Sequence, residues 1–484
     1  MKLTKMALAA AIATALFGSA AFAQQTGVST RVTSNAYDYY TQEGASPSDK
    51  APVQQVPAQE APAVQSAQLP DSSSNFYQGV AEEEAAAAGY VPKDYFTLMG
   101  MFDDGCGGNI LADRNLLIGG SIAQSFTANF DNPNSRFNGP VTWTDRSNEY
   151  QLNQAWMYAE KVTDTSDQDF DWGGRVDSFW GTNARWAIAQ GLEDQINNSR
   201  QFYGIAIPNA YATLAYQDTS VKVGHFVSPV GYFTIDTTQN FFNTIPYTYQ
   251  YGEPFTHTGA WVNQKFNDNL HIGGGVTRGW DNVDGGRGNP QTGSPNAGAF
   301  GMAHLVGDSG SSLTWFGHWS NELNQVGGFT SRYIQSVVFQ AKVSENITFV
   351  AQSDYGNQDQ ARANGGSAQW FGSNNYLFLK LTDRVTWGTN VEWFRDDDGF
   401  RVGTVLPPSS AYSFRGAQLA GNFAGDFYQC TTGPRINIKD NIILRPNVRF
   451  DWYTGLDRGP GTRPYVDGNL NQQVILATDL LWLF

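Results

Sequence analysis

The sequence lacks long apolar runs. Beyond one short apolar stretch near the N-terminus, none of its 484 residues belongs to a run of about 18 consecutive apolar side chains, the length that a membrane-spanning helix requires. This absence excludes a helical membrane protein. It leaves a transmembrane β-barrel open, because a barrel strand alternates lipid-facing and water-facing residues.

Positive charge and cysteine are also scarce. Lys and Arg number 30 against 45 Asp and Glu, so the net charge is -15. Such a chain has no basic field to release counterions from phosphates, which excludes nucleic acid as a partner. The two cysteines are too few for a thiolate zinc site. Cys106 and Cys430 either form a disulfide, as an oxidising exported compartment favours, or stay free.

Signatures of catalysis are missing as well. No G-x-S-x-G element is present, and the histidines show no metal-ligand spacing. The five histidines are His225, His257, His271, His304 and His318. We therefore expect no enzyme, no metal site and no cofactor, and we interpret the histidines as polar residues of a lumen or of loops.

The chain does contain an export signal. Two lysines precede an apolar run from Met6 to Phe17, and small residues lead to an Ala-Phe-Ala motif that ends at Ala23. This pattern predicts a secretory signal peptide over residues 1–23, cleaved before Gln24. The predicted protein is therefore exported.

A low-complexity segment follows the signal peptide. Residues 24–90 are rich in Gln, Ala, Pro, Ser and Glu and show no usable hydrophobic period. Such a composition buries too little apolar surface to fold, so we expect a disordered periplasmic extension. It is either a plain linker or a tether or partial plug. Residues 91–114 are the lead-in to the next region.

From residue 115 onward, side chains alternate with a period of two, as in β-strands. In one segment the apolar face consists of Phe170, Trp172, Val176 and Trp180. The opposite face carries Asp171, Arg175 and Asp177. Trp at both ends of the apolar stripe favours lipid, and aromatics at 14% of the chain are typical of the two girdles of a membrane barrel.

The alternating segments predict an all-β fold, a transmembrane antiparallel up-and-down β-barrel of about sixteen strands over residues 115–484. Long outer loops alternate with tight periplasmic turns, as such a barrel requires. The expected strands are 115–130, 150–161, 168–180, 209–218, 219–227, 258–266, 269–281, 298–306, 311–320, 331–343, 346–355, 370–381, 384–395, 423–438, 442–453 and 470–484. The expected long connections are 131–149, 181–208, 228–257, 282–297, 321–330, 356–369, 396–422 and 454–469.

The last strand carries a further signal. One face holds Val474, Leu476, Leu480, Trp482 and the terminal Phe484. This pattern resembles the terminal-strand signal that is read when bacterial outer-membrane barrels assemble. The alternative is a buried edge strand that happens to end in Phe.

A family resemblance supports the same architecture. The segment GYFTIDTTQNFFNTIPYTYQYGEPFTHTG, from Gly231 to Gly259, resembles the type 2 family of β-barrel porins, described as OmpL-like, whose members run into a similar EPFTHTG element. The resemblance extends from about Asp94 to Phe484. It implies an outer-membrane barrel with a pore function, and it brings no catalytic or ligand residues with it.

The longest predicted loop, 228–257, is the candidate constriction. It is the third outer loop, where general porins fold a loop into the lumen, and it contains no Lys or Arg. We hypothesise that its acids, Asp236 and Glu253, face basic wall residues across the pore. The wall residues of this candidate site are Arg175, Asp177, Arg445, Arg449 and Asp451. The alternative is a loop that packs outside as a lid or subunit contact.

We therefore predict an outer-membrane porin, a water-filled channel through which ions and small hydrophilic solutes diffuse passively. Its partners would be those solutes, outer-membrane lipid and, by analogy with general porins, two further copies in a homotrimer. The loop aromatics either guide sugars or simply pack the loop. The rival functions are a structural or adhesive surface barrel without an open pore and a secreted, soluble carbohydrate-binding protein.

Overall fold

The computed structural model describes residues 93–106, 108–197, 202–284, 297–307, 310–403, 423–457 and 459–484. The predicted signal peptide, 1–23, and the predicted periplasmic segment, 24–90, lie outside these residues. Within the described ranges, no helix is long and apolar enough to cross a membrane.

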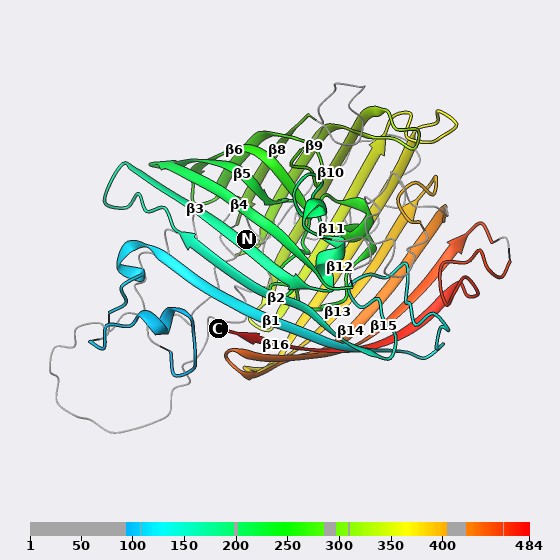
Figure 1. Ribbon diagram of the computed structural model, residues 1–484, viewed down its shortest axis with the longest axis horizontal. Helices are drawn as coiled ribbons and strands as arrows, with labels where there is room; N and C mark the ends of the chain where they lie inside the picture. Colours follow the sequence, from blue (N-terminus) through cyan, green and yellow to red (C-terminus); the bar gives the residue numbers. More distant parts are fainter. Residues whose placement is uncertain are drawn as a thin grey trace, which may run out of the picture.

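Sixteen antiparallel strands form one closed ring, in which each strand pairs with its sequence neighbours and β1 pairs with β16 (Figure 1). The predicted fold class is confirmed. The strands are β1 (Leu116–Asn129), β2 (Glu149–Lys161), β3 (Phe170–Gly181), β4 (Gly204–Tyr216), β5 (Thr219–Val227), β6 (Thr256–Asn267), β7 (Leu270–Thr277), β8 (Gly298–Val306), β9 (Ser312–Leu323), β10 (Phe329–Ser344), β11 (Ile347–Gln358), β12 (Ala368–Thr382), β13 (Val385–Asp396), β14 (Gly425–Lys439), β15 (Ile442–Gly455) and β16 (Gln472–Leu483).

The helical elements described are single turns. They are η1 (Met99–Phe102), η2 (Ala112–Arg114), η3 (Asn183–Trp186), η4 (Glu193–Gln195) and the π-turn η5 (Thr248–Gly252). The first two belong to the lead-in before β1, and the other three lie in outer loops.

Two connections differ from the expected alternation. The outer connection expected at 321–330 shrinks to 324–328, because β9 and β10 keep pairing as far as Leu323 and Phe329. At the other end of the barrel, the β2–β3 connection occupies 162–169 and is not a tight turn. The barrel is unaffected, because strand order depends on pairing and not on loop length.

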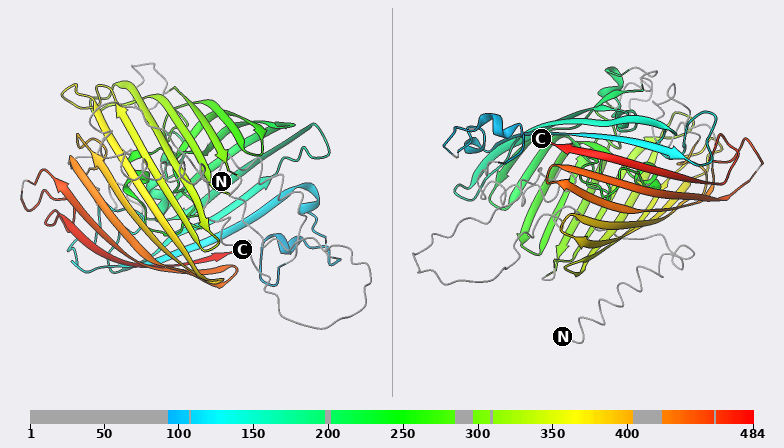
Figure 2. Two further views of the ribbon diagram at one scale, coloured as in Figure 1. Left: turned by 180° about the vertical axis from the view of Figure 1, so that it is seen from behind. Right: turned by 90° about the horizontal axis from the view of Figure 1, so that it is seen from below.

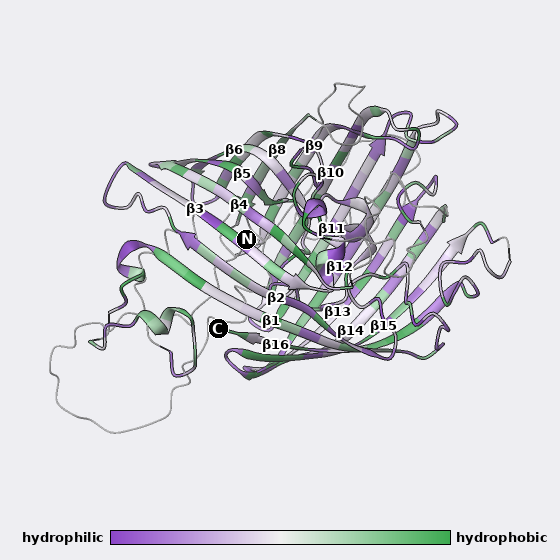
Figure 3. Ribbon diagram, viewed as in Figure 1, coloured by the Kyte–Doolittle hydropathy of each residue, from purple (hydrophilic) through white to green (hydrophobic). Residues whose placement is uncertain are grey.

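The two faces of each strand separate as the period of two predicts. On β3, the outward Trp172 and Val176 are 59% and 55% exposed, whereas the inward Arg175 and Asp177 are buried. Hydrophobic and hydrophilic residues alternate along the strands in the same way (Figure 3). Apolar side chains on the outside of a closed ring require hydrocarbon around them, so this wall is lipid-facing.

Outward aromatic rings form a contiguous row across neighbouring strands. Trp319, Tyr333, Tyr355 and Phe371 lie on β9 to β12, and consecutive rings are 4.8, 6.4 and 5.2 Å apart. Aromatic rings with a polar edge are favoured where hydrocarbon meets headgroups. The row is therefore the expected aromatic girdle at one membrane interface.

The ring closes where the two ends of the barrel meet. The amide of Gly120 donates to the carbonyl oxygen of Phe484 at 2.8 Å, and the Phe484 amide donates back at 2.9 Å. Leu476 and Trp482 face outward, as predicted for the terminal strand. Two views agree that the C-terminus lies beside the lead-in to β1 (Figure 2).

The lipid-facing assignment of β3 predicts the effect of a charge there. Val176→Arg should lower the free energy of unfolding from vesicles by about 2–4 kcal/mol, because the guanidinium would enter hydrocarbon. Val326→Arg is the matched control, since Val326 is 67% exposed in an outer connection. Denaturant titration of folding measures both. Equal losses in the two variants, or none in either, would contradict the assignment.

Candidate functional site

The third outer loop lies inside the ring. This loop, L3 (228–255), joins β5 to β6, and only Gly231 and Tyr232 of its residues escape burial. Its polar partners lie on the inward faces of β2, β11, β12, β13 and β15. The barrel wall therefore surrounds L3, as porin-like placement of this loop predicts.

Wall side chains satisfy the backbone carbonyls of L3. The donor–acceptor pairs are Gln154 Nε2 to Ile235 O at 2.6 Å, Arg445 Nη1 to Thr237 O at 2.8 Å, Arg449 Nη1 to Ile245 O at 2.7 Å and Trp370 Nε1 to Gly252 O at 3.1 Å. A buried loop without such donors would leave unpaired carbonyls, each of them unfavourable. The wall thus holds L3 in part by its backbone.

One wall carboxylate accepts hydrogen bonds from backbone amides of L3. Glu392 on β13 accepts hydrogen bonds from the amides of Tyr247 and Thr248, immediately before and at the start of η5. The Tyr247 hydroxyl also donates to Asp451 at 2.9 Å. The start of the π-turn is therefore held by β13 and β15, which lie on the same part of the wall.

Neighbouring outer loops cover L3 from above. The Tyr251 hydroxyl donates to the carbonyl oxygen of Pro140, in the β1–β2 loop. Arg401, after β13, donates to the Tyr251 carbonyl and places its guanidinium 4.9 Å from the Trp370 ring and 5.2 Å from the Trp280 ring. These contacts join the β1–β2 loop and the loop after β13 to L3. Through Arg401, they also reach Trp280 in the loop after β7.

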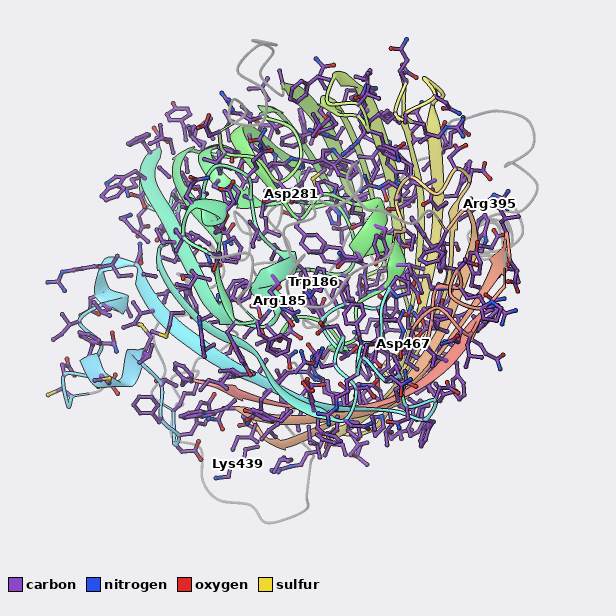
Figure 4. All side chains as sticks on the ribbon, turned by 45° about the vertical axis from the view of Figure 1, so that its right-hand side comes forward. Arg185, Trp186, Asp281, Arg395, Lys439 and Asp467 are labelled. Carbon is purple, nitrogen blue, oxygen red and sulfur yellow. The ribbon has the colours of Figure 1, made fainter. Side chains whose placement is uncertain are left out.

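Two further anchors involve Asp281 and Arg185, which are labelled in Figure 4. Asp281 accepts hydrogen bonds from the amides of Phe255 and Thr256, where L3 returns to β6. Arg185, next to Trp186, forms an ion pair with Asp145 at 2.9 Å. The end of L3 and the loops above it are therefore tied to the barrel mouth.

The predicted arginines are on the inner wall, and each has a carboxylate partner on the wall itself. Arg175 pairs with Glu160 at 2.8 Å and with Asp177 at 2.7 Å. Arg445 pairs with Asp479 at 2.6 Å, and Arg449 pairs with Asp451 at 2.8 Å. Much of the wall's positive charge is thus balanced by the wall.

The two loop acids lie inside the barrel with the predicted wall residues. Asp236 accepts hydrogen bonds from Thr238 and Gln239 of its own loop, and Glu253 accepts one from Gln352 on β11 at 2.6 Å. Burial raises the pKa of Asp236, although Arg175 opposes the shift. Like the predicted wall residues, both acids are buried. The seven predicted residues therefore share one lumen, and the transverse field between loop acids and wall arginines stays a prediction.

Sequence reasoning missed Glu392, Gln154, Gln352 and Trp370 as partners of L3. Glu392, Gln352 and Trp370 lie on the inward faces of their strands by the period of two, so the signal for facing the lumen was present. Gln154 adjoins a register shift at Asn153 that breaks the period in β2. The identity of the residue that each one contacts could not be predicted, because contacts across a barrel follow no local spacing.

Of the two alternatives for the cysteines, the structure has the unpaired one. Cys106 and Cys430 are both free thiols. Cys106 lies in the lead-in at the periplasmic end, whereas Cys430 faces outward within β14. The two thiols therefore belong to different parts of the molecule.

The histidines make ordinary polar contacts. His257 contacts the Ser228 hydroxyl and the Gly279 carbonyl, both at 3.0 Å. His318 contacts Thr277 and accepts a hydrogen bond from Trp280. Throughout the described ranges, no group of three or more His, Cys, Asp or Glu residues is arranged to hold a metal ion.

Comparison with known families now decides the identity of the barrel. Residues 115–484 match the family described as "Putative beta-barrel porin-2, OmpL-like". The chain belongs to this porin family. The match spans the whole barrel and begins at residue 115, later than the Asp94 start suggested by the resemblance. This porin barrel is therefore an outer-membrane protein of the channel type.

Solved structures share the fold at low sequence identity. The outer membrane channel DcaP of Acinetobacter baumannii is 11% identical, with a TM-score of 0.50 over 76% of this chain and 97% of that one. The anion-selective porin from Comamonas acidovorans is 9% identical, with a TM-score of 0.49 over 76% and 99% of the two chains. No curated protein matches the sequence.

A second outer loop closes a gap that L3 leaves in the porin's wall. Because L3 turns inward after β5, the first residues of β4, before Ala210, do not pair with β5. The loop after β3 lies beside them instead. Glu193 accepts hydrogen bonds from the amides of Ile207 on β4 and Ala189, at 2.7 and 2.9 Å. Gln190 hydrogen-bonds to Asp281 and Val283 on the next exposed edge.

Removing Arg449 tests how the wall holds L3. Arg449→Met would leave Asp451 buried without its cation and would free the Ile245 carbonyl, a loss of about 3–5 kcal/mol. The amides of Tyr247 and Thr248 should then exchange hydrogen faster. Arg384→Met is the control, because Arg384 lies in an exposed periplasmic turn. Unchanged exchange in both variants would contradict this anchoring.

The Glu193 contact should weaken at high pH. Burial raises the pKa of Glu193 to about 7, despite the backbone amides of Ile207, Ala189 and Glu193 itself, which lower it. A raised carboxyl pKa stabilises the folded state at low pH, and that stability is lost as the pH rises through about 7. Protection of the Ala189 and Ile207 amides, corrected for intrinsic exchange, should be higher at pH 5.5 than at pH 8.5. Glu193→Gln should remove the difference, and a difference that persists in this variant would refute the assignment.

Proposed function

We propose that this porin lets ions and small hydrophilic solutes diffuse passively across the outer membrane, through a passage that L3 narrows. The carrying observation is the position of L3, whose 228–255 backbone crosses the lumen and is hydrogen-bonded to the inner wall. A ring of sixteen strands is wider than its own side chains can fill. Whatever occupies the lumen therefore sets the width of the passage.

Buried charge near L3 supports a role in selectivity. Glu253 and Asp236 bring negative charge into a lumen whose arginines already have wall partners. An acid in a narrow, poorly solvated passage favours cations over anions. We assign the strongest influence to Glu253, because its carboxylate is fully buried within L3.

Two finer features remain proposals. The barrel would assemble as a homotrimer, by analogy with general porins. The L3 aromatics pack against one another, as Tyr249 does on Phe255 at 4.4 Å and Phe233 does on Tyr249 at 5.1 Å. This arrangement favours packing of the loop over a sugar-guiding strip.

One observation favours the rival function of a structural or adhesive barrel. Arg445, Arg449, Asp177 and Glu253 are all 0% exposed, so water does not reach these side chains. A porin needs an open passage past these contacts to conduct. A surface barrel without a pore needs none.

Planar-bilayer recording separates the two functions. The folded wild type should show single channels, and Glu253→Gln should lower the cation-to-anion permeability ratio measured from reversal potentials in a salt gradient. Asp268→Asn is the matched control, because the Asp268 side chain is 93% exposed in a periplasmic turn.

The possible outcomes are distinct. Absence of channels from properly folded wild type would overturn the porin proposal in favour of the closed surface barrel. Channels with the same reversal potential in the wild type and in Glu253→Gln would retain the porin and remove Glu253 from its selectivity.

A further inference from the structure

The lead-in to the barrel follows its periplasmic rim. We call residues 93–106 and 108–114 the rim segment; it carries η1 and η2. Its start lies close to the β14–β15 turn, where Asp440 acts electrostatically on Lys93 and Tyr95. It then passes the end of β16, where the rings of Phe96 and Phe484 are 6.5 Å apart. The rim segment thus runs from β15 past β16 to β1.

The rim segment reaches a strand edge that β16 does not cover. β1 begins at Leu116, but its pairing with β16 starts only at Ser121, and Phe484 reaches no further than Gly120. On the exposed edge, the amide of Ile118 donates to the Met99 sulfur at 3.4 Å. The rim segment therefore takes the place of a strand next to the protruding start of β1.

Large apolar side chains of the rim segment are unusually exposed. Phe96, Met101, Phe102 and Ile110 are 54%, 68%, 38% and 52% exposed. Four large apolar side chains exposed within one short segment are unfavourable in water and point to a contact with a membrane or another molecule. The charged residues of the segment, such as Asp104 and Asp113, offer the polar side that an interfacial segment needs.

Continuity with the lipid-facing wall identifies the occupant. Phe96 contacts Phe484, and Phe484 contacts Trp482 at 5.1 Å, which is 39% exposed on the lipid face of β16. An apolar surface that continues the lipid belt meets the same solvent as the belt, at the depth where acyl chains give way to headgroups. Figure 2 shows the rim segment at this end of the barrel, next to the C-terminus.

We propose that the rim segment is a membrane-surface anchor, which immerses Phe96, Met101, Phe102 and Ile110 in phospholipid of the inner leaflet. It would lie in the interface without crossing it. The anchor would shield the β1–β16 seam from water and fix the direction in which the chain leaves the barrel. The proposal depends on the outer-membrane barrel and is independent of whether the barrel conducts.

Site-directed fluorescence in lipid nanodiscs tests the anchor. Met101→Cys is labelled with an environment-sensitive dye in a Cys106→Ser, Cys430→Ser background. Asp113→Cys in the same background is the control, because Asp113 is an exposed polar residue of the same segment. Both sites are on the surface, so folding should survive, and the heat-dependent gel shift of folded barrels verifies it.

Lipid and water quenchers distinguish the outcomes. The Met101 label should be quenched at least three-fold more by phosphatidylcholine with a doxyl group near its headgroup than the Asp113 label is, and less by iodide. Equal iodide quenching at the two sites would overturn the anchor. A Met101 label shielded from both quenchers would also overturn it, because protein would then cover the surface.

Discussion

The closed ring of strand pairing is the constraint on which the rest of this molecule depends. Hydrocarbon offers no partner to a backbone amide or carbonyl, so a membrane-spanning sheet cannot have a free edge. Here the last edge closes between Gly120 and Phe484. Once the ring is closed, each strand must present apolar side chains to lipid and can place its polar ones only inside.

The same alternation buries charged side chains on the inner wall, and L3 supplies hydrogen-bond acceptors for them. Inward faces carry buried charges such as Arg445 and Asp479, which pair with each other. Each arginine nevertheless has more donors than one carboxylate can use. Further N–H groups of Arg445 and Arg449 donate to the carbonyls of Thr237 and Ile245, respectively. Loop and wall are therefore complementary, through these hydrogen bonds and through apolar contacts such as that of Phe241 with Phe378.

The sequence predicted the ring well because its signals are local. The period of two, the tight turns and the terminal Phe484 are each readable within about ten residues. The contacts inside the ring were not predictable, because partners such as Arg449 and Ile245 are joined by no period or turn. Arg175 illustrates the division: its inward face followed from Trp172 and Val176, but its pairing with Glu160 required the strand register. The pairing of the two cysteines could not be decided from the sequence for the same reason, because no local pattern tells how far apart they lie.

Accessibility of spin labels placed at successive positions along β13 tests the central claim most directly. If lipid surrounds the ring and L3 packs against its inner wall, labels at Val391 and Trp393 should be accessible to oxygen, and a label at Asn390 should be accessible neither to oxygen nor to a water-soluble nickel complex. A nickel-accessible Asn390 would contradict this packing of L3. Nickel access at Val391 and Trp393, with oxygen access at Asn390, would contradict the barrel's orientation itself.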